Sequence, residues 1–99
     1  MIEIIFKASE NINKYIELKK YAQLISDLNI FGKGVEHDST HYLENTYFKW
    51  EKDDLKVKLY WNDYDIHTFC LDILLNEKRD INPIINILKN KIENLIIKE

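Results

Sequence analysis

Three histidines are the residues of this chain whose spacing could build a metal site. His37 and His41 lie four residues apart, Glu36 and Asp38 flank His37, and His67 follows later. This spacing joins two imidazoles on a helix, but Asp38 stands where a zinc-binding HExxH motif has its glutamate. The small polar residues between the histidines also favour a loop. We therefore expect exposed histidines and no metal, and keep a metal-binding or enzymatic domain centred on His37, His41 and His67 as an alternative.

Cys70, the only cysteine, could act as a nucleophile only beside a base. His67 is close in sequence, but residues three apart on a strand point to opposite faces, so its imidazole cannot reach the thiol. A single cysteine also excludes a disulfide framework. Cys70 is therefore predicted to be a small apolar filler of the fold.

Two pairs of carboxylates could carry acid–base chemistry, Asp53 with Asp54 and Asp63 with Asp65. Both pairs lie between predicted strands, where aspartate is favoured because its side chain hydrogen-bonds the turn backbone. Turn formation is thus preferred over general acid–base catalysis. Because the chain also lacks GxGxxG, GxxxxGK and GxSxG motifs, the sequence predicts no enzyme and no cofactor.

The segment from about residue 46 to 75 predicts an antiparallel meander of three strands, reversed at the two aspartate-rich turns. Alternation places Leu55, Val57 and Leu59 on one face together with Phe69 of the next strand. The first of the three strands is expected from about Tyr42 to Glu51, and residues 35–45 are open to either a loop or its beginning. The opposite, uncovered face would show Tyr47, Lys49, Lys56, Lys58, Tyr60, Thr68, Cys70 and Asp72.

A strand and a helix are predicted ahead of the meander. Residues 2–7 are rich in branched and aromatic side chains, which favour a strand. An amphipathic helix follows to about Leu28, with Ser9, Asn11 or Asn13 as its N-cap and Glu17 among the residues pointing outward. Gly32 is the expected C-cap. A right-handed crossover through this helix could place the first strand parallel to a meander strand.

The last predicted element is a helix that opens around Asp80 and Asn82, with Pro83 near its first turn. Its apolar stripe runs from Ile84 to Ile96. The fold class expected for residues 1–99 is therefore a single α+β domain in the order β-α-β-β-β-α. It is a two-layer sandwich in which both helices cover the Leu55/Val57/Leu59/Phe69 face.

Acidic charge is concentrated in the middle of the chain. Residues 1–33 sum to +1, residues 34–77 to −6 and residues 78–99 to +2. Such a distribution attracts basic partners and repels phosphate backbones. The first ten residues lack the features of a signal peptide, so we expect a cytoplasmic protein. Abundant lysine, isoleucine and asparagine suggest a bacterial gene or a mobile element.

Double-stranded-RNA-binding domains share the order helix, three strands, helix, and grip phosphates with lysines at the start of the last helix. Here that helix opens with Asp80, and only Lys78 and Arg79 precede it. The acidic middle segment also opposes phosphate binding. The sequence therefore predicts no nucleic-acid partner, and no membrane partner either.

Aromatic residues alternate with acids across residues 42–65. Phe48 and Trp61 are expected in the core, and one of Tyr42 or Trp50 is expected at the surface. Exposed tyrosines beside carboxylates are typical of interfaces with Lys/Arg-rich proteins. The predicted partner-binding residues are Tyr47, Glu51, Asp53, Asp54, Tyr60, Asp63, Tyr64 and Asp65.

In its small size, acidity and lack of catalytic residues, the chain resembles bacterial immunity proteins. The resemblance rests on these general properties and on no sequence motif. The resemblance implies an inhibitor that neutralises a basic nuclease toxin by occluding its active-site cleft. A phage-type inhibitor of a host defence nuclease is the nearest alternative. A homodimer through the open sheet face or an edge strand is a third, structural reading.

Overall fold

The computed structural model describes residues 1–7, 13–32, 34–38, 46–52, 55–62, 68–75 and 80–98, with the backbone alone at His37 and Asp38. It contains two helices, α1 (Lys14–Asp27) and α2 (Asn82–Lys91). The strands are β1 (Ile2–Lys7), β2 (Val35–Asp38), β3 (Thr46–Lys52), β4 (Leu55–Trp61), β5 (Thr68–Leu75) and β6 (Ile96–Lys98). Within these residues no helix has the length and apolarity needed to cross a membrane.

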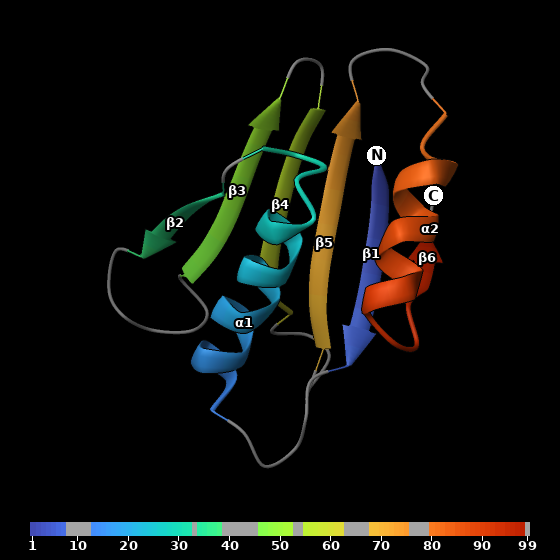
Figure 1. The fold of residues 1–99 in the computed structure, drawn as a ribbon. Helices are drawn as coiled ribbons and strands as arrows, with labels where there is room; N and C mark the ends of the chain where they lie inside the picture. Colours follow the sequence, from blue (N-terminus) through green and yellow to red (C-terminus); the bar gives the residue numbers. More distant parts are fainter. Residues whose placement is uncertain are drawn as a thin grey trace.

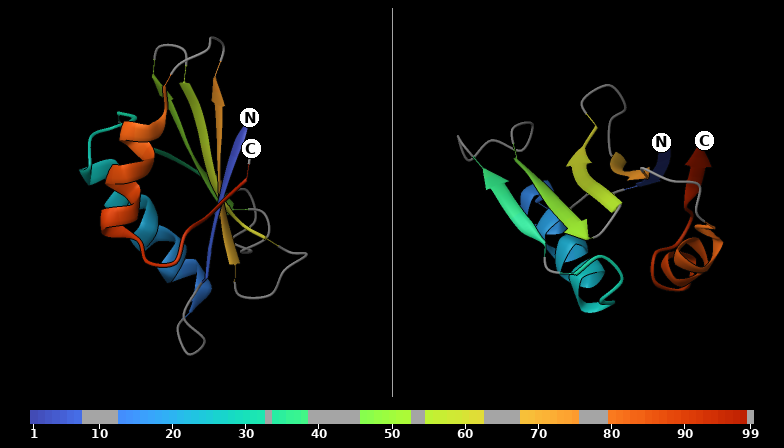
Figure 2. Two further views of the ribbon diagram at one scale, coloured as in Figure 1. Left: turned by 90° about the vertical axis from the view of Figure 1, so that its right-hand side faces the viewer. Right: turned by 90° about the horizontal axis from the view of Figure 1, so that it is seen from above.

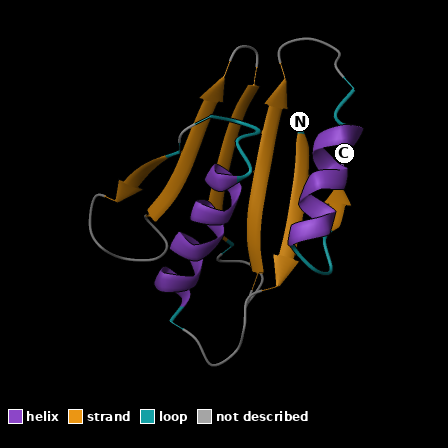
Figure 3. Ribbon diagram, in the orientation of Figure 1, coloured by secondary structure: helices purple, strands orange, loops and turns teal. Residues whose placement is uncertain are grey.

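The strands form one six-stranded sheet in the order β2-β3-β4-β5-β1-β6 (Figures 1 and 3). Every neighbouring pair is antiparallel. The predicted α+β class and the meander β3-β4-β5 are confirmed. Two short strands extend the expected order to β-α-β-β-β-β-α-β.

Both helices cover the same face of the sheet, as the left view of Figure 2 shows. The strand residues beneath them include Leu55, Val57, Leu59 and Phe69, all of which are buried. The predicted packing face is therefore confirmed. In the described part of the chain, the opposite face of the sheet has no helix over it.

Helix α1 begins at the last of the three N-cap candidates. The Asn13 side chain accepts hydrogen bonds from the backbone N–H groups of Tyr15 and Ile16, at 2.9 and 3.3 Å. The helix ends before Gly32, so the predicted glycine C-cap is wrong. Leu28 is the C-cap, and Asn29 then adopts the left-handed conformation, with φ 54°, that asparagine tolerates better than most residues.

Glu17 was expected to point outward from α1, but its side chain is only 3% exposed. Burial is compatible with its polarity because Tyr21, one turn along, donates its hydroxyl hydrogen to the Glu17 carboxylate. Burial, and then this carboxylate, raise the pKa of the Tyr21 phenol above its ordinary value.

The expected strand from Tyr42 to Glu51 begins later than predicted. Strand β3 starts at Thr46, and β2 pairs with it in the register Val35 opposite Lys49 and Asp38 opposite Thr46. The polar content of β2 gave no alternating apolar signal, because β2 is an edge strand with one neighbour and little burial.

The last helix is shorter than its apolar stripe. It ends at Lys91, and Ile92 is the C-cap in an extended conformation. Asn94 then adopts φ 58°, which reverses the chain and lets Ile97 pair with Ile4. At its start the predicted Asp or Asn N-cap is wrong, because Ile81 is the N-cap and no side chain caps it. Pro83 lies in the first turn as predicted, and Asp80 Oδ1, one residue before the cap, accepts the Asn82 N–H at 3.0 Å.

Strand β1 does not form a parallel pair with a meander strand. It pairs antiparallel with β5, in a register that sets Ile4 opposite Leu71 and Phe6 opposite Phe69. It thus runs in the same direction as β4, but β5 lies between them. This position gives the apolar side chains of β1 neighbours on both sides, from β5 and from β6.

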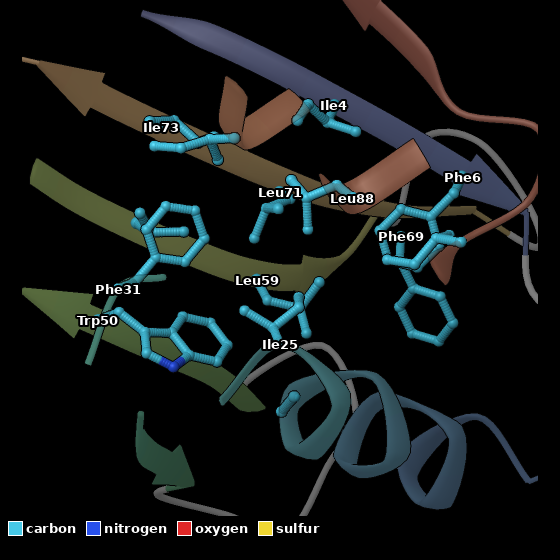
Figure 4. Close-up of a cluster of buried hydrophobic side chains, with 14 of the residues drawn as sticks. Ile4, Phe6, Ile25, Phe31, Trp50, Leu59, Phe69, Leu71, Ile73 and Leu88 are labelled. Atoms are coloured by element: carbon cyan, nitrogen blue, oxygen red, sulfur yellow. The ribbon is translucent and has the colours of Figure 1, made fainter. Parts of the chain in front are cut away.

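The core lies between the helices and the sheet (Figure 4). Trp50 is fully buried in it. One of Tyr42 or Trp50 was expected at the surface, and this leaves Tyr42, which lies outside the described residues. Phe48 and Trp61 are partly buried against the same cluster. The Trp50 indole N–H donates to Ser26 Oγ of α1 at 3.1 Å. The same ring packs on Gly34, where a Cβ would come within 2.6 Å of its Nε1. Trp50 therefore links β3, α1 and the segment before β2.

Candidate protein-binding face

The face of the sheet opposite the helices is the candidate site, and we call it the open face. Its side chains alternate with those of the core along every strand, as the antiparallel registers require. The described open-face residues are Glu3, Ile5, Lys7, Val35, Tyr47, Lys49, Glu51, Lys56, Lys58, Tyr60, Thr68, Cys70, Asp72, Leu74, Ile96 and Lys98.

Tyr47 and Tyr60 stand directly opposite each other on β3 and β4. The Lys58 ammonium lies over both rings, 4.5 Å from the Tyr47 centroid and 5.1 Å from the Tyr60 centroid. A cation over two aromatic faces is attracted by the quadrupole of each ring. The three side chains therefore hold one another in place before any partner arrives.

Tyr60 is also fixed at its hydroxyl end. Its O–H hydrogen-bonds Asp72, and the Cys70 thiol lies within hydrogen-bonding reach on the same strand. Burial, followed by the hydrogen bond to Asp72, raises the pKa of the Tyr60 phenol well above its ordinary value of 10.0. The phenol consequently stays protonated to higher pH than an exposed tyrosine.

Cys70 and Thr68 are less accessible than predicted. Although both are on the open face, Cys70 is 2% exposed and Thr68 4%. Burial is the main reason that the pKa of the Cys70 thiol is raised. A protonated, covered thiol is a poor nucleophile, which agrees with its predicted role as a filler.

Glu51 lies at the far end of the open face from the tyrosines. Its carboxylate pairs with the Lys49 ammonium at 2.7 Å. This hydrogen-bonded pair raises the pKa of Lys49 and lowers the pKa of Glu51. Both groups are solvent-exposed, so the pair fixes local geometry more than it adds stability.

One cross-strand row, which we call the central row, orders the charges of the open face. It runs from β2 to β6 through Val35, Lys49, Lys58, Asp72, Glu3 and Lys98. Two lysines are thus neighbours, and next to them two acids are neighbours. Like charges directly opposite each other on adjacent strands lower folding stability. The pairs Lys49–Lys58 and Asp72–Glu3 are therefore unfavourable in the isolated chain.

A second row, the tyrosine row, lies beside it and is mainly apolar. It contains Tyr47, Tyr60, Cys70, Ile5 and Ile96. Next to its β1/β6 end is a hollow of about 490 Å³ whose lining includes Ile5, Ile96, Leu95 and Lys98. A shallower depression of about 340 Å³ lies over β3, β4 and β5, among Tyr47, Lys49, Lys58 and Asp72.

The structure brings three of the predicted partner-binding residues, Tyr47, Glu51 and Tyr60, onto this one face. Asp53, Asp54, Asp63, Tyr64 and Asp65 lie outside the described residues. In the chain, residues 53–54 come directly before β4 and residues 63–65 come shortly after it, and the two ends of this seven-residue strand are roughly 20 Å apart.

The alternative of a metal-binding or enzymatic domain centred on the three histidines is not tested by the described residues. His41, His67 and the His37 side chain lie outside the described residues. Among the side chains that are described, no three histidine, cysteine, aspartate or glutamate residues gather around a point that could hold a metal ion.

Sequence reasoning predicted Lys49, Lys58 and Asp72 on this face but missed the order of charges in the central row and the places of Glu3 and Lys98 in it. Regional charge sums assign the middle segment −6. Within that segment, strands β3 and β4 place Lys49, Lys56 and Lys58 on the open face, as their alternation predicted. The alternation of lysine along β4 did signal this, but only the strand registers show which acids stand beside them.

The chain matches no protein-family model, no curated protein sequence and no solved structure.

Proposed function

We propose that this protein is a small cytoplasmic inhibitor that binds a basic protein partner through its open face and the acidic turns at either end of β4. The partner fits best as a nuclease, neutralised in the manner of an immunity-type protein by occlusion of its active-site cleft. The supporting observation is the pair Tyr47 and Tyr60, side by side on an uncovered face and held by Lys58.

Pre-positioned aromatic side chains make effective binding anchors, because little side-chain entropy is lost when a partner closes over them. In the chain, Asp53 and Asp54 come directly before β4, and Asp63 and Asp65 come shortly after it. Carboxylates at both ends suit a cleft whose rim is basic because it binds phosphate. The lysines between them suit the metal-binding carboxylates that many nucleases carry at the cleft centre.

Occlusion explains inhibition without chemistry on either protein. A surface about 20 Å long along the strands covers a cleft and excludes its phosphodiester substrate. Association steered by opposite charge is fast, and it slows as salt screens the charges. A phage-type inhibitor of a defence nuclease would use the same surface, and the identity of the partner separates the two.

The test is capture of the partner from a lysate of the source organism, followed by its identification and an assay of its nuclease activity. We expect stoichiometric loss of that activity when the chain is added, with binding that weakens at high salt. Replacing Tyr47 by alanine should weaken binding about 30-fold, the loss of an interface anchor. Lys91→Ala, on the exposed side of α2, is the matched control and should bind normally. A captured nuclease that stays active when bound, or equal affinity for both variants, contradicts the proposal.

A further inference from the structure

The charge order of the central row is self-complementary. Across β3, β4, β5 and β1 it reads Lys49, Lys58, Asp72, Glu3, that is, two positive groups followed by two negative groups. Consider a second copy related by a two-fold axis that runs parallel to the strands, between β4 and β5. This rotation places the central row of the second copy over that of the first in the opposite order. Lys58 then faces Asp72 of a second copy, and Lys49 faces its Glu3.

We propose that the open face binds the open face of a second copy of this chain about this axis. An isologous two-fold interface repeats every contact twice, so the paired charges count double. The other face-to-face arrangement, with the axis across the strands, would set Lys49 and Lys58 against the same lysines. Charge therefore selects one of the two arrangements.

The tyrosine row supports the same axis through shape. The rotation that sets Lys49 over Glu3 carries Tyr47 over Ile5 of the second copy. Ile5 and Ile96 belong to the lining of the hollow of about 490 Å³ at that end of the face. A tyrosine ring thus meets an apolar depression flanked by Lys7 and Lys98, and the phenol can stay near these polar groups.

The edges of the sheet are poor alternatives to this interface. Strand β2 has four residues and β6 has three. Short edge strands offer few unpaired backbone groups for pairing with another chain. The part of the open face formed by the four longer strands, by contrast, measures roughly 20 by 23 Å. With the two short edge strands its area is still below the ~800 Å² per partner of a standard interface. We therefore expect a dimer that dissociates on dilution.

Dimerisation does not rest on the proposed inhibitor function, but it uses the same face. The two predictions can fail separately, since self-association is measured on the purified chain alone. If both proposals hold, a second copy of the chain competes with the partner for the open face. At high concentration, part of the protein is then dimeric and unable to bind the partner.

The experiment is sedimentation of the purified chain over a wide concentration range. The average mass should rise from the 11.9 kDa of one chain towards twice that value, and less steeply at high salt. Lys49→Glu and Glu3→Lys should each weaken association roughly fivefold or more. An equimolar mixture of these two variants should associate as strongly as the unaltered chain, because each new glutamate then meets a new lysine.

Lys20→Glu on the outer side of α1 makes the same charge change away from the face and should leave association unaltered. Thermal unfolding of every variant checks that it is folded, and rescue in the mixture cannot come from misfolded chains. An unaltered chain that stays monomeric into the millimolar range overturns the proposal. So does a mixture that associates no better than its components, or a Lys20→Glu variant as weak as Lys49→Glu.

Discussion

Tyr60 combines three constraints that seldom coincide on an exposed sheet face. Its ring faces Tyr47, the Lys58 ammonium lies over it, and its hydroxyl is held by Asp72. The sequence predicted Tyr60 to be an accessible binding residue, and the structure adds contacts that restrict its side chain. Rigidity matters because an anchor already in its bound rotamer loses little entropy on binding.

The raised pKa of Tyr60 predicts a loss of folding stability at high pH that Tyr60→Phe should reduce. Because the folded-state pKa exceeds the unfolded value of 10.0, the stabilisation is complete below that pH and is lost as pH rises through the folded-state pKa. Ultraviolet titration of the folded chain should therefore show phenols that ionise late, and Tyr60→Phe should remove part of that late fraction.

The urea-unfolded chain is the reference for this titration, since all its phenols should ionise together near their ordinary pKa. The stability of Tyr60→Phe should also fall less than that of the unaltered chain above about pH 10. Identical titration curves for the folded and unfolded chains would contradict this assignment.

Gly34 is a second residue whose role only the structure reveals. Its Cα lies against the Trp50 indole, and a Cβ there would come 2.6 Å from Nε1 and 2.7 Å from Cε2. Gly34→Ala should thus lower the free energy of unfolding by about 1–3 kcal/mol, as overpacking does. Denaturant titration measures this loss.

Trp50→Phe provides the matched test of that contact. The smaller ring leaves room for the new methyl group, so the double variant should lose less stability than the two single losses added together. Simple additivity would show that the alanine acts through the backbone and not through the indole.

At the scale of elements, hydrophobic alternation predicted the meander correctly because its strands are long and have one buried face. The same reasoning missed β2 and β6, which are short edge strands with little periodic signal. It also extended the last helix through Ile96, since an apolar stripe does not show where a chain reverses. Asn29 and Asn94, both in the left-handed backbone conformation, lie just after the ends of α1 and α2.

The candidate site was predictable in part for a related reason. Tyr47, Glu51 and Tyr60 share a face because strand periodicity is two, which a sequence displays directly. The order of charges in the central row depends on how β1 pairs with β5, that is, on pairing between residues 2–7 and residues 68–73. No local pattern carries that register.

The start of α1 gives a prediction at this scale. Asn13 accepts two backbone hydrogen bonds there. Asn13→Ala should lower the free energy of unfolding by about 1 kcal/mol, because these N–H groups lose their acceptor. Asn13→Asp, which keeps the acceptor, should retain most of the stability in the same thermal or denaturant experiment. Equal losses in both variants would assign the cap elsewhere.

For the whole molecule, a single cluster of buried residues joins both helices to the sheet. Leu59 lies in the middle of β4 within that cluster and is fully buried. Leu59→Ala should cost about 2–5 kcal/mol through lost burial and a cavity. Unfolding should remain a single transition when followed by both tryptophan fluorescence and circular dichroism. Two separate transitions would mean that the helices and the sheet are not one cooperative unit.

The position of β1 has a consequence for how the chain is made. Residues 2–7 are synthesised well before their neighbours in the sheet, which are residues 68–75 and 96–98. Until those segments are synthesised, Ile2, Ile4 and Phe6 have no strand to pair with. Such distant pairing also slows folding, so refolding from denaturant should take milliseconds to seconds.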